Sequence, residues 1–475
     1  MSRSNFLLIV IGLASLLVYL AAAGLVDLRV HTIEFVVAFG AAFVLYLLAA
    51  ALVLRVDEAN GTRLTLGLTI IFAVLFNVIL LPTKPTLSDD MYRYVWDGRV
   101  QAHGISPYQY PPNAIELVDL WRSDRAIWAN INRPSSMTVY PPGAQIAFAA
   151  MWRIVGDSVI GFKTLFVIAE LIGAWLLLKL LRWFKQPPER LLIYLWSPLL
   201  IFEIAQAGHL DGLMLLFLLL AFYARVTDRY GWLGVSLGAA TAIKLFPAIL
   251  LFALWPLPRW YRAPRPWSWR SWRNAFVTIA GFAGVLVIGY VTYAVQGANP
   301  LGFLPQYFGE NFNLGLAYGL FELAKQWQVP GSTLVNIITF GGLAILSLIF
   351  LVRPAASGRE ALLRCVWLIG WFTLTTQNLF AWYLLWLLPL IVLFVEPGKF
   401  LGLKFAPLSA WLIFSGTIAL SYLFFIKWRP ILAVQVIEFV LLYVMLCIAG
   451  FVALKHWITA KWHWLIQPST SKSEA

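Results

Sequence analysis

Residues 5–25 read NFLLIVIGLASLLVYLAAAGL and contain no Asp, Glu, Lys or Arg. An α-helix rises about 1.5 Å per residue, so a run of this length crosses the ~30 Å hydrocarbon core of a bilayer. A cleaved signal peptide fits less well, because the run is long and no small-residue cleavage site follows a short apolar core. We therefore predict a transmembrane helix here.

Comparable apolar runs follow along the chain, at residues 33–54, 64–82, 159–181, 191–205, 210–224, 274–295, 333–352, 361–376, 382–396, 405–426 and 431–454. Lys244 and Pro247 interrupt the stretch 231–257, which predicts two short helices meeting at a turn. Segments 143–157 and 314–328 are ambiguous between short spans, re-entrant pieces and juxtamembrane helices. The pattern predicts an all-α, polytopic transmembrane helical bundle of roughly 11–14 spans, with residues 1–475 forming a single integral-membrane domain.

The composition excludes several classes of protein. Hydrophobic residues make up 61% of the 475 residues and charged residues only 12%, whereas soluble proteins carry about 25% charged residues. A soluble enzyme, a disordered chain and a nucleic-acid-binding domain are therefore excluded. The two cysteines, Cys365 and Cys447, lie in apolar stretches and give neither a disulfide framework nor a metal-ligand spacing.

The net charge of +13 then indicates basic loops on one side of a membrane. The basic residues that flank the apolar runs are Arg55, Arg63, Arg182, Lys185, Arg190, Arg225, Arg229, Arg259, Arg262, Arg265, Arg270, Arg273, Arg353, Arg359, Arg364, Lys399 and Lys404. Placing them in the cytoplasm puts both termini inside. Residues 83–142 then form a first large extracytoplasmic loop, which is too long for a plain connection and is expected to carry juxtamembrane helices.

That loop opens with SDDMYRYVWDGRVQAHGISPY at residues 88–108. A helix here places Asp90, Tyr94 and Asp97 on one face, and lets Asp89 pair with Arg93 at a spacing of four. A carboxyl group beside an apolar membrane has a raised pKa, which suits a general base. The alternative is structural, with Ser88 capping the helix and the acidic residues stabilising its positive end.

Three further polar motifs fall on the same side. Tyr140 belongs to the rigid VYPPGAQ segment, and the GHLDG turn carries His209 and Asp211, which we expect to bind a sugar hydroxyl or a phosphate. One His and one Asp are too few ligands for a metal site. Lys244 needs a counter-charge inside its apolar run, either a lipid phosphate or an internal carboxylate.

A late motif completes the set of candidates. Gln377, Trp382 and Tyr383 lie at the outer end of a predicted span. Amide groups bind sugar hydroxyls and tryptophan stacks on a sugar face, although an interfacial aromatic belt explains the same residues. The loop with Tyr307, Glu310 and Asn311 could line an entry for an acceptor.

Taken in order, the pieces DDMYRYVWDGRVQAHGISPY, VYPPGAQ, GHLDG, KLFP and AWYLLWLLP resemble the GT-C superfamily of integral-membrane glycosyltransferases. Within it, they are most similar to polyprenyl-phosphate-mannose-dependent mannosyltransferases. The pieces are scattered over residues 88–390, and only the first is specific by itself. The resemblance implies a polyprenyl-phosphate-linked sugar as donor and an acidic loop residue as catalytic base. Relatives of this kind differ in their need for a metal.

These observations predict transfer of mannose or another hexose from a polyprenyl-phosphate donor to a hydroxyl group of a glycan or glycolipid acceptor, with inversion. The site would face outward from the inner membrane of a prokaryote. Asp89 or Asp90 would be the base, with Asp89 slightly preferred, and Lys244, supported by Arg93 or His209, would hold the phosphate. Asp97 and Asp211 would orient sugar hydroxyls. No cofactor is predicted, and a divalent metal is left open.

Two other classes of protein share part of this pattern. A transporter or flippase of lipid-linked sugars also has many spans and buried charges, but it often carries inverted repeats, and no repeat is visible in this sequence. A ligase or polymerase of lipid-linked sugars is expected to place its main polar loop late in the chain. The early polar loop favours the glycosyltransferase.

Overall fold

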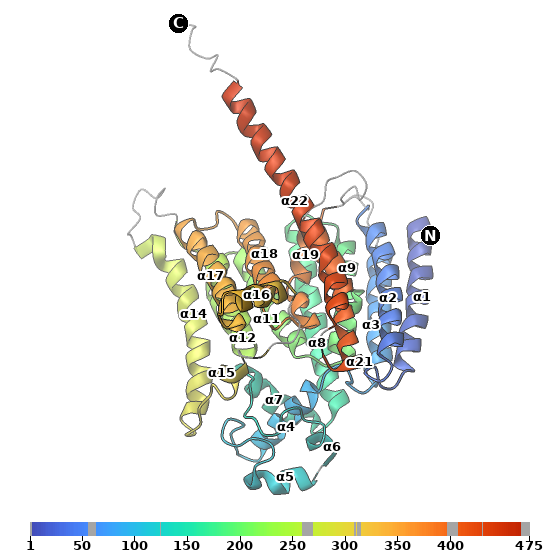
Figure 1. The fold of residues 1–475 in the computed structure, drawn as a ribbon, viewed down its shortest axis with the longest axis vertical. Helices are drawn as coiled ribbons and strands as arrows, with labels where there is room; N and C mark the ends of the chain where they lie inside the picture. The colour runs from blue at the N-terminus through green and yellow to red at the C-terminus, as the bar shows by residue number, and fades with distance from the viewer. Residues whose placement is uncertain are drawn as a thin grey trace.

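The computed structural model describes residues 2–55, 63–123, 125–258, 269–307, 310, 315–396, 407–429 and 431–466. Throughout these ranges the chain forms helices joined by turns, with no β-strand. The predicted all-α, polytopic membrane architecture is therefore confirmed. Figure 1 shows a bundle of long helices with a smaller helical layer at one end.

Eight segments among the described residues are long and apolar enough to cross a membrane. They are α1 (Arg3–Ala23), α2 (Thr32–Val53), α3 (Arg63–Leu80), α8 (Val159–Trp183), α14 (Trp269–Ala294), α17 (Gly331–Val352), the run α20, η6 and α21 (Pro407–Thr417, Ile418–Leu423 and Phe424–Lys427), and α22 (Leu432–Ile466). Their apolar side chains point outward as well as inward; Leu17 is 69% exposed and Val37 67%. Helices that are apolar on all sides are typical of membrane spans.

The other predicted spans are shorter, carry more charge, or are interrupted. They comprise α9 (Leu191–Leu195), α10 (Pro198–Ile201), the π-helical turn η3 (Phe202–Gln206), α11 (Asp211–Val226), α18 (Gly358–Thr375), η5 (Ala381–Trp386) and α19 (Leu388–Phe394). Several of these segments bury nearly every residue. Because neighbouring helices surround them, their breaks are shielded from lipid.

The stretch 231–257 is broken as predicted. Helix α12 (Tyr230–Ile243) ends at Lys244, whose backbone is extended. The short helices η4 (Phe246–Leu250) and α13 (Leu251–Leu254) follow. Pro247 has no N–H for a continuous helix. The break exposes Lys244 to the interior of the bundle.

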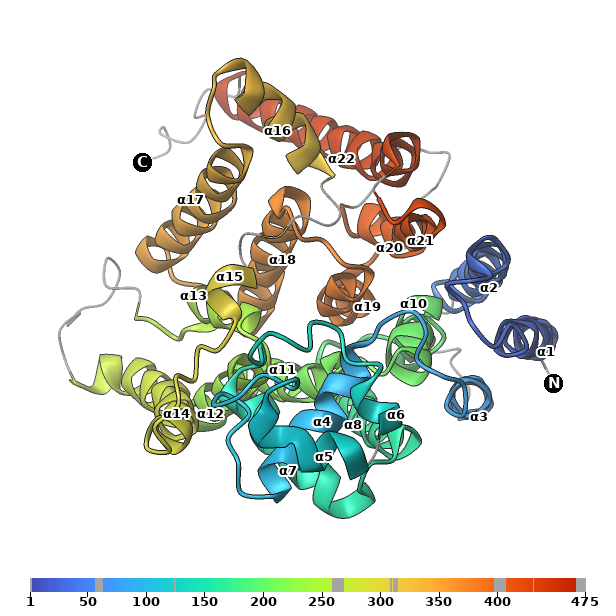
Figure 2. The same cartoon turned by 60° about the horizontal axis from the view of Figure 1, so that its bottom comes forward.

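The predicted polar loop is a compact layer of helices: α4 (Asp90–Ala102), η1 (Ile115–Leu117), α5 (Val118–Ser123), α6 (Arg125–Trp128) and α7 (Pro142–Val155). Figure 2 views this layer from its own side, in front of the bundle. Tyr94 of α4 stacks on Phe148 of α7 at 4.7 Å between ring centroids. A Cβ atom at Gly98 would lie 2.7 Å from the Phe148 carbonyl oxygen, so only glycine permits this approach.

Neither of the two ambiguous segments forms a span. Helix α7 has 14 residues and α16 (Leu316–Gln326) has 11, and both are too short to cross a bilayer core at about 1.5 Å per residue. A further short helix, α15 (Leu304–Tyr307), lies in the connection before α16.

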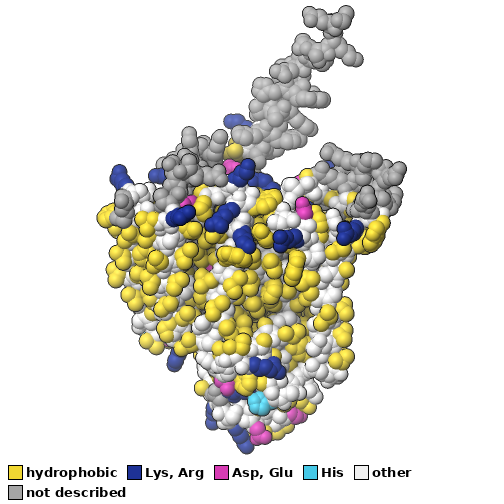
Figure 3. Space-filling view, turned by 180° about the vertical axis from the view of Figure 1, so that it is seen from behind, with side chains coloured by type: hydrophobic (Ala, Val, Ile, Leu, Met, Phe, Trp, Pro, Cys, Tyr) yellow, Lys and Arg dark blue, Asp and Glu magenta, His cyan; other side chains and the backbone are white. Residues whose placement is uncertain are grey.

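The arginine-rich end and the loop helices lie at opposite ends of the bundle. Helix α11 carries Asp211 at its start and Arg225 near its end, which separates the two by roughly 21 Å along the axis. Arg225 donates a hydrogen bond to the Leu254 carbonyl, and Arg190 donates one to that of Val395. Figure 3 shows Lys and Arg along one edge of a broad apolar band. Arg259, Arg262, Arg265, Lys399 and Lys404 lie outside the described residues.

Candidate functional site

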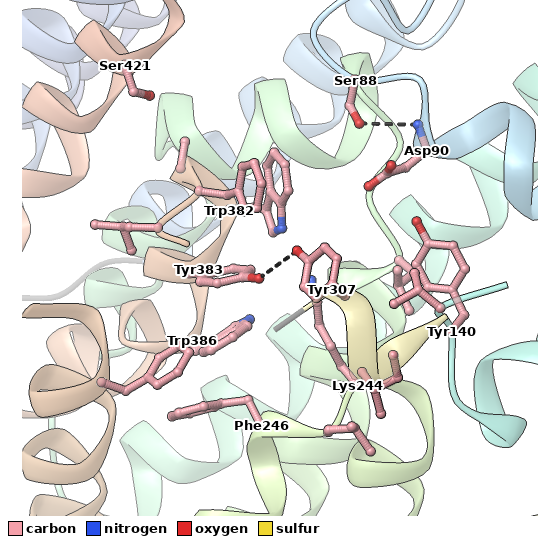
Figure 4. A pocket seen from close by; sticks show the side chains of 18 of the residues that line it. Ser88, Asp90, Tyr140, Lys244, Phe246, Tyr307, Trp382, Tyr383, Trp386 and Ser421 are labelled. Atoms are coloured by element: carbon pink, nitrogen blue, oxygen red, sulfur yellow. Dashed lines mark hydrogen bonds between the residues drawn. The ribbon is translucent and has the colours of Figure 1, made fainter. Parts of the chain in front are cut away.

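A cavity of about 1070 Å³ lies between the loop helices and the bundle. Among the residues that the structure describes, seven charged ones line it: Arg29, Asp89, Asp90, Arg93, Arg133, Lys244 and Glu438. Figure 4 shows Asp90 and Tyr140 on one wall, Trp382, Tyr383 and Trp386 on the other, and Lys244 and Tyr307 between them. Residues from the first and last thirds of the chain thus meet around one space.

The two adjacent carboxylates at the start of α4 have different partners. Asp89 Oδ1 pairs with Arg29 Nη2 at 2.7 Å, and Arg29 comes from the connection between α1 and α2. The predicted pairing of Asp89 with Arg93 is therefore wrong. Arg93 instead pairs with Asp97 at 2.7 Å, because both side chains lie in the packed face of α4. The Asp89 carboxylate is therefore held by a residue from another part of the chain.

Asp90 makes weaker contacts and faces the cavity. Its Oδ1 accepts a hydrogen bond from Asn132 at 2.8 Å, and its Oδ2 lies 3.9 Å from His209 Nδ1. Burial raises the pKa of Asp90, although the Asn132 hydrogen bond and the charge of Lys244 act in the opposite direction. Asp90 is therefore a better proton acceptor than an exposed carboxylate.

The helix-capping alternative explains only part of this arrangement. Ser88 Oγ accepts a hydrogen bond from the Asp90 backbone N–H at 3.2 Å. The Asp89 side chain makes no capping hydrogen bond. The serine therefore supports the start of α4, whereas the Asp89 carboxylate binds Arg29 and the Asp90 carboxylate faces the cavity.

Lys244 projects from the break after α12 onto the cavity wall. Its Nζ lies 2.6 Å from Asp211 Oδ2, and Trp386 Nε1 donates to Asp211 Oδ1 at 2.8 Å. Asp211 is fully buried, whereas one fifth of the Lys244 side chain remains exposed. Asp211 is thus the internal counter-charge that the sequence required for Lys244, and the ammonium group still reaches the cavity.

Aromatic rings surround this ammonium group. The Lys244 Nζ lies 5.4 Å from the ring centroid of Tyr383 and 5.6 Å from that of Trp386. Tyr383 stacks on Trp386 at 4.5 Å, and its hydroxyl lies 3.4 Å from that of Tyr307. The part of the cavity around Asp90, Lys244 and these rings is called the polar chamber below. Its ring faces suit the apolar face of a sugar.

Eight of the twelve residues predicted from the sequence line the cavity: Asp89, Asp90, Arg93, Tyr94, Tyr140, Lys244, Trp382 and Tyr383. The other four, Asp97, His209, Asp211 and Gln377, are buried behind its wall. The carboxylate of Asp97 binds Arg93 and Gln145, and that of Asp211 binds Lys244 and Trp386. Both carboxylates therefore contact residues of the cavity wall rather than the cavity itself.

Sequence reasoning missed Arg29, Asn132 and Trp386, all of which line the cavity. Arg29 could have been found, because it is a lone arginine in the short connection between the first two spans, opposite the arginine-rich end. Asn132 carried no local signal. Trp386 belonged to the WYLLW motif, but only contact with Asp211 distinguishes it from an interfacial ring.

The cavity continues as an apolar groove between helices. Its walls are Ile249, Phe252, Phe340, Leu343, Ala344, Leu348, Leu351 and Val434, which come from η4, α13, α17 and α22. The polar chamber and this groove form one continuous space. A ligand with a charged head and a long apolar tail matches both parts.

In the part of the chain that the structure describes, no group of three or more His, Cys, Asp or Glu side chains could hold a metal ion. The chain's own cations at the cavity are Arg29, Arg93, Arg133 and Lys244. Among the residues expected at an acceptor entry, Tyr307 lines the cavity, Glu310 pairs with Arg133, and Asn311 lies outside the described residues.

Comparison with known proteins places this geometry in a family. A family model described as "Alpha-(1->6)-mannopyranosyltransferase, N-terminal domain" matches residues 11–258, more than half of the chain. The chain belongs to this family. The resemblance to membrane mannosyltransferases is thereby confirmed. The residues matched by this mannopyranosyltransferase family model include Asp89, Asp90 and Lys244. Trp382 and Tyr383 lie beyond them.

One curated relative is alpha-(1->6)-mannopyranosyltransferase B of Corynebacterium glutamicum. It is 26% identical to this chain over 347 residues, which make up 65% of this chain and 55% of the relative. The chain thus spans about half the length of the curated relative that it matches.

Proposed function

We propose that this protein transfers mannose, or a closely related hexose, from a polyprenyl-phosphate donor to a hydroxyl group of a glycan or glycolipid. The observation that carries the proposal is the continuous cavity. Asp90 and Lys244 line its polar chamber, and an apolar groove leads from that chamber between the spans. Membership of the mannopyranosyltransferase family supports the sugar and the reaction class.

Asp90 is the proposed base. The acceptor hydroxyl attacks the anomeric carbon while Asp90 takes its proton, and the bond from that carbon to the phosphate oxygen breaks. The configuration inverts in this single displacement. We prefer Asp90 to Asp89, because Arg29 holds Asp89 at 2.7 Å, whereas Asp90 faces the cavity and burial raises its pKa.

Lys244 is the proposed cation for the leaving polyprenyl phosphate. An ammonium group partly shielded from water stabilises developing phosphate charge more strongly than an exposed one. Arg29 and Arg93 line the same chamber and supply further positive charge. Because these side chains supply cations, we propose that transfer proceeds without a divalent metal.

The apolar groove is the proposed site for the prenyl chain. Burial of each methylene contributes about 0.8 kcal/mol, so a groove of aliphatic and phenyl groups retains the lipid while the headgroup reacts. The arginine-rich end of the bundle would face the cytoplasm. The chamber would then open on the extracytoplasmic side of a prokaryotic inner membrane.

The direct test uses the full chain in lipid nanodiscs with radiolabelled polyprenyl-phosphate-mannose and a mannosyl glycolipid acceptor. We expect label in the glycolipid, and nuclear magnetic resonance should show the anomeric configuration opposite to that of the donor. Donor consumption without a new glycosidic bond would contradict the proposal. Movement of labelled donor across proteoliposomes without transfer would support the flippase alternative instead.

A further inference from the structure

Behind the cavity wall lie two buried ionisable side chains that the proposed reaction leaves unused. Glu203, in the π-helical turn η3, is fully buried, and His209, in the turn after it, is 1% exposed. Neither lines the cavity. Burial of such groups is costly unless they act on each other or on the site.

His209 lies between two carboxylates. Its Nε2 is 3.4 Å from Glu203 Oε2, and its Nδ1 is 3.9 Å from Asp90 Oδ2. Its ring stacks on Trp382 with centroids 3.9 Å apart, which fixes the direction of both nitrogens. Neither Nε2 nor Glu203 Oε2 has a hydrogen bond of good geometry among the described residues. No competing hydrogen bond among the described residues therefore holds either atom when the His209 ring gains a proton.

The local backbone explains how His209 comes to lie between these two carboxylates. The His209 N–H donates to the Glu203 carbonyl at 2.9 Å, across the π-helical turn. Gly208 has φ +76°, a left-handed backbone conformation that other residues adopt only with strain. This glycine therefore allows the turn that brings His209 beside Asp90. Such π-helical turns are frequent at functional sites.

Glu203 is in turn held by a residue of the cavity wall. Tyr422 of η6 donates its hydroxyl hydrogen to Glu203 Oε1 at 2.5 Å, and Tyr422 lines the cavity. The contacts therefore run from Asp90 through His209 and Glu203 to Tyr422. A carboxylate that orients an imidazole, which in turn serves a reacting group, is a recurrent arrangement in catalysis.

We propose that His209, held by Glu203, accepts the proton that Asp90 removes from the acceptor hydroxyl. This inference rests on the proposed function. This step requires the tautomer with its proton on Nε2, toward Glu203, and its lone pair on Nδ1, toward Asp90. The acceptor's O–H bond breaks as its bond to the anomeric carbon forms, and the phosphate leaves with the electron pair of the bond that breaks.

The proton then passes from Asp90 to His209 Nδ1, and Glu203 balances the imidazolium charge. It returns through Asp90 to water once product leaves. The gap of 3.9 Å closes on substrate binding, as catalytic hydrogen bonds that are long in an empty site commonly do. His209 and Glu203 are positioning residues, because Asp90 alone touches the acceptor.

Burial and the charge of Lys244 lower the pKa of His209, so the resting imidazole is neutral and able to accept a proton. Asp211 pairs with Lys244 at 2.6 Å. Asp90 from α4 and Glu203 from η3 both favour the imidazolium. Tyr94 of α4 and Tyr422 of η6 are neutral at working pH.

The test compares three variants of the full chain in nanodiscs, each assayed for mannose transfer between about pH 5 and pH 9. His209→Gln retains the side-chain bulk but accepts no proton. Glu203→Gln retains the shape but removes the charge. Glu170→Gln is the matched control, because Glu170 is equally buried in α8 and does not line the cavity.

Burial lowers the pKa of His209, so the acid limb of kcat/KM in this range should report the ionisation of Asp90 alone, with a slope of about one on a logarithmic plot. His209→Gln should leave that limb in place and lower kcat about 10- to 100-fold, with little change in KM. Glu203→Gln should lower kcat in the same direction, because the imidazolium loses the carboxylate that holds it. Glu170→Gln should match the wild type.

A folded His209→Gln protein with the wild-type kcat would overturn the inference, as would a loss confined to KM. If His209→Gln does not fold, the kcat of Glu203→Gln decides in the same way. Absence of transfer by the wild type would instead reject the proposed function itself, so the two failures are distinguishable.

Discussion

The two halves of the chain contribute different kinds of side chain to the same cavity. Residues 11–258, which match the family model, supply six of the seven charged lining residues. The described residues between 269 and 466 supply one charged lining residue, Glu438, and twelve aromatic ones, against four aromatic ones from the described part of the first half. The first half therefore carries the proposed chemistry, and the second half shapes the space around it.

This division has a consequence for experiments. Substitutions among the charges of the first half should act on the chemical step, whereas substitutions in the apolar wall of the second half should act on which donor fits. A single substitution in either half that altered both the chemical step and the donor preference would contradict this division of roles.

The largest effect is expected for Asp90→Asn. Loss of a general base lowers kcat about 10²- to 10⁴-fold, while the isosteric amide leaves the contact with Asn132 possible. Transfer from labelled polyprenyl-phosphate-mannose measures it, with monodispersity on size-exclusion chromatography as the folding check. Asp119→Asn, outside the cavity on α5, is the control. Near-wild-type transfer by Asp90→Asn would remove it as the base.

The next effect is expected for Lys244→Met. It removes the proposed phosphate contact and leaves Asp211 buried without its cation, which costs about 3–5 kcal/mol of stability. Adding Asp211→Asn should restore the melting temperature but leave transfer reduced about 100-fold. Lys179→Met, whose ammonium lies over Trp175 outside the cavity, is the matched control. Recovery of both stability and transfer in the double variant would limit Lys244 to a structural role.

A smaller, directional effect concerns pH. Burial raises the pKa of Asp90, and a base must be ionised, so activity should fall at a higher pH than for an exposed aspartate. The Asn132 hydrogen bond lowers this pKa, so Asn132→Ala should move the acid limb of kcat/KM further upward. A shift downward would show that Asn132 does not bind the ionised carboxylate.

In the second half, Leu343→Trp should narrow the apolar groove. Long polyprenyl donors should lose about 10-fold in kcat/KM relative to short ones, which corresponds to about 1.4 kcal/mol. Ile345→Trp on the same helix is the control, because Ile345 is 62% exposed and does not line the cavity. Equal effects of both substitutions, or no dependence on the length of the donor's prenyl chain, would show that the groove does not bind that chain.

The smallest effect is expected for chelation. If the chain's own cations balance the phosphate, EDTA should change the transfer rate less than about twofold. A large loss that Mg²⁺ or Mn²⁺ restores would show that the cations lining the cavity are insufficient.

Most of the fold and part of the site followed from the sequence. The apolar runs predicted the long helices, and Lys244 with Pro247 predicted the break after α12. Asp89 and Asp90 were both predicted as candidates for the base, with Asp89 slightly preferred, because a carboxyl group beside an apolar membrane suits that role. The partners were not predictable: Arg29 lies 60 residues from Asp89, and Trp386 lies 175 residues from Asp211. Local spacing favoured Asp89 with Arg93, and tertiary packing gave each a different partner.

The amino-acid sequence alone determined that this chain is a helical membrane protein with a polar layer at one end, because hydropathy and helix length are properties of neighbouring residues. It also determined which side chains were candidates. The tertiary structure decided which of them share the cavity and which stand behind it, since burial and pairing depend on elements far apart in the chain. Asp211 and His209 looked like ligands in sequence. They became supports only when Lys244, Glu203 and Asp90 were packed around them.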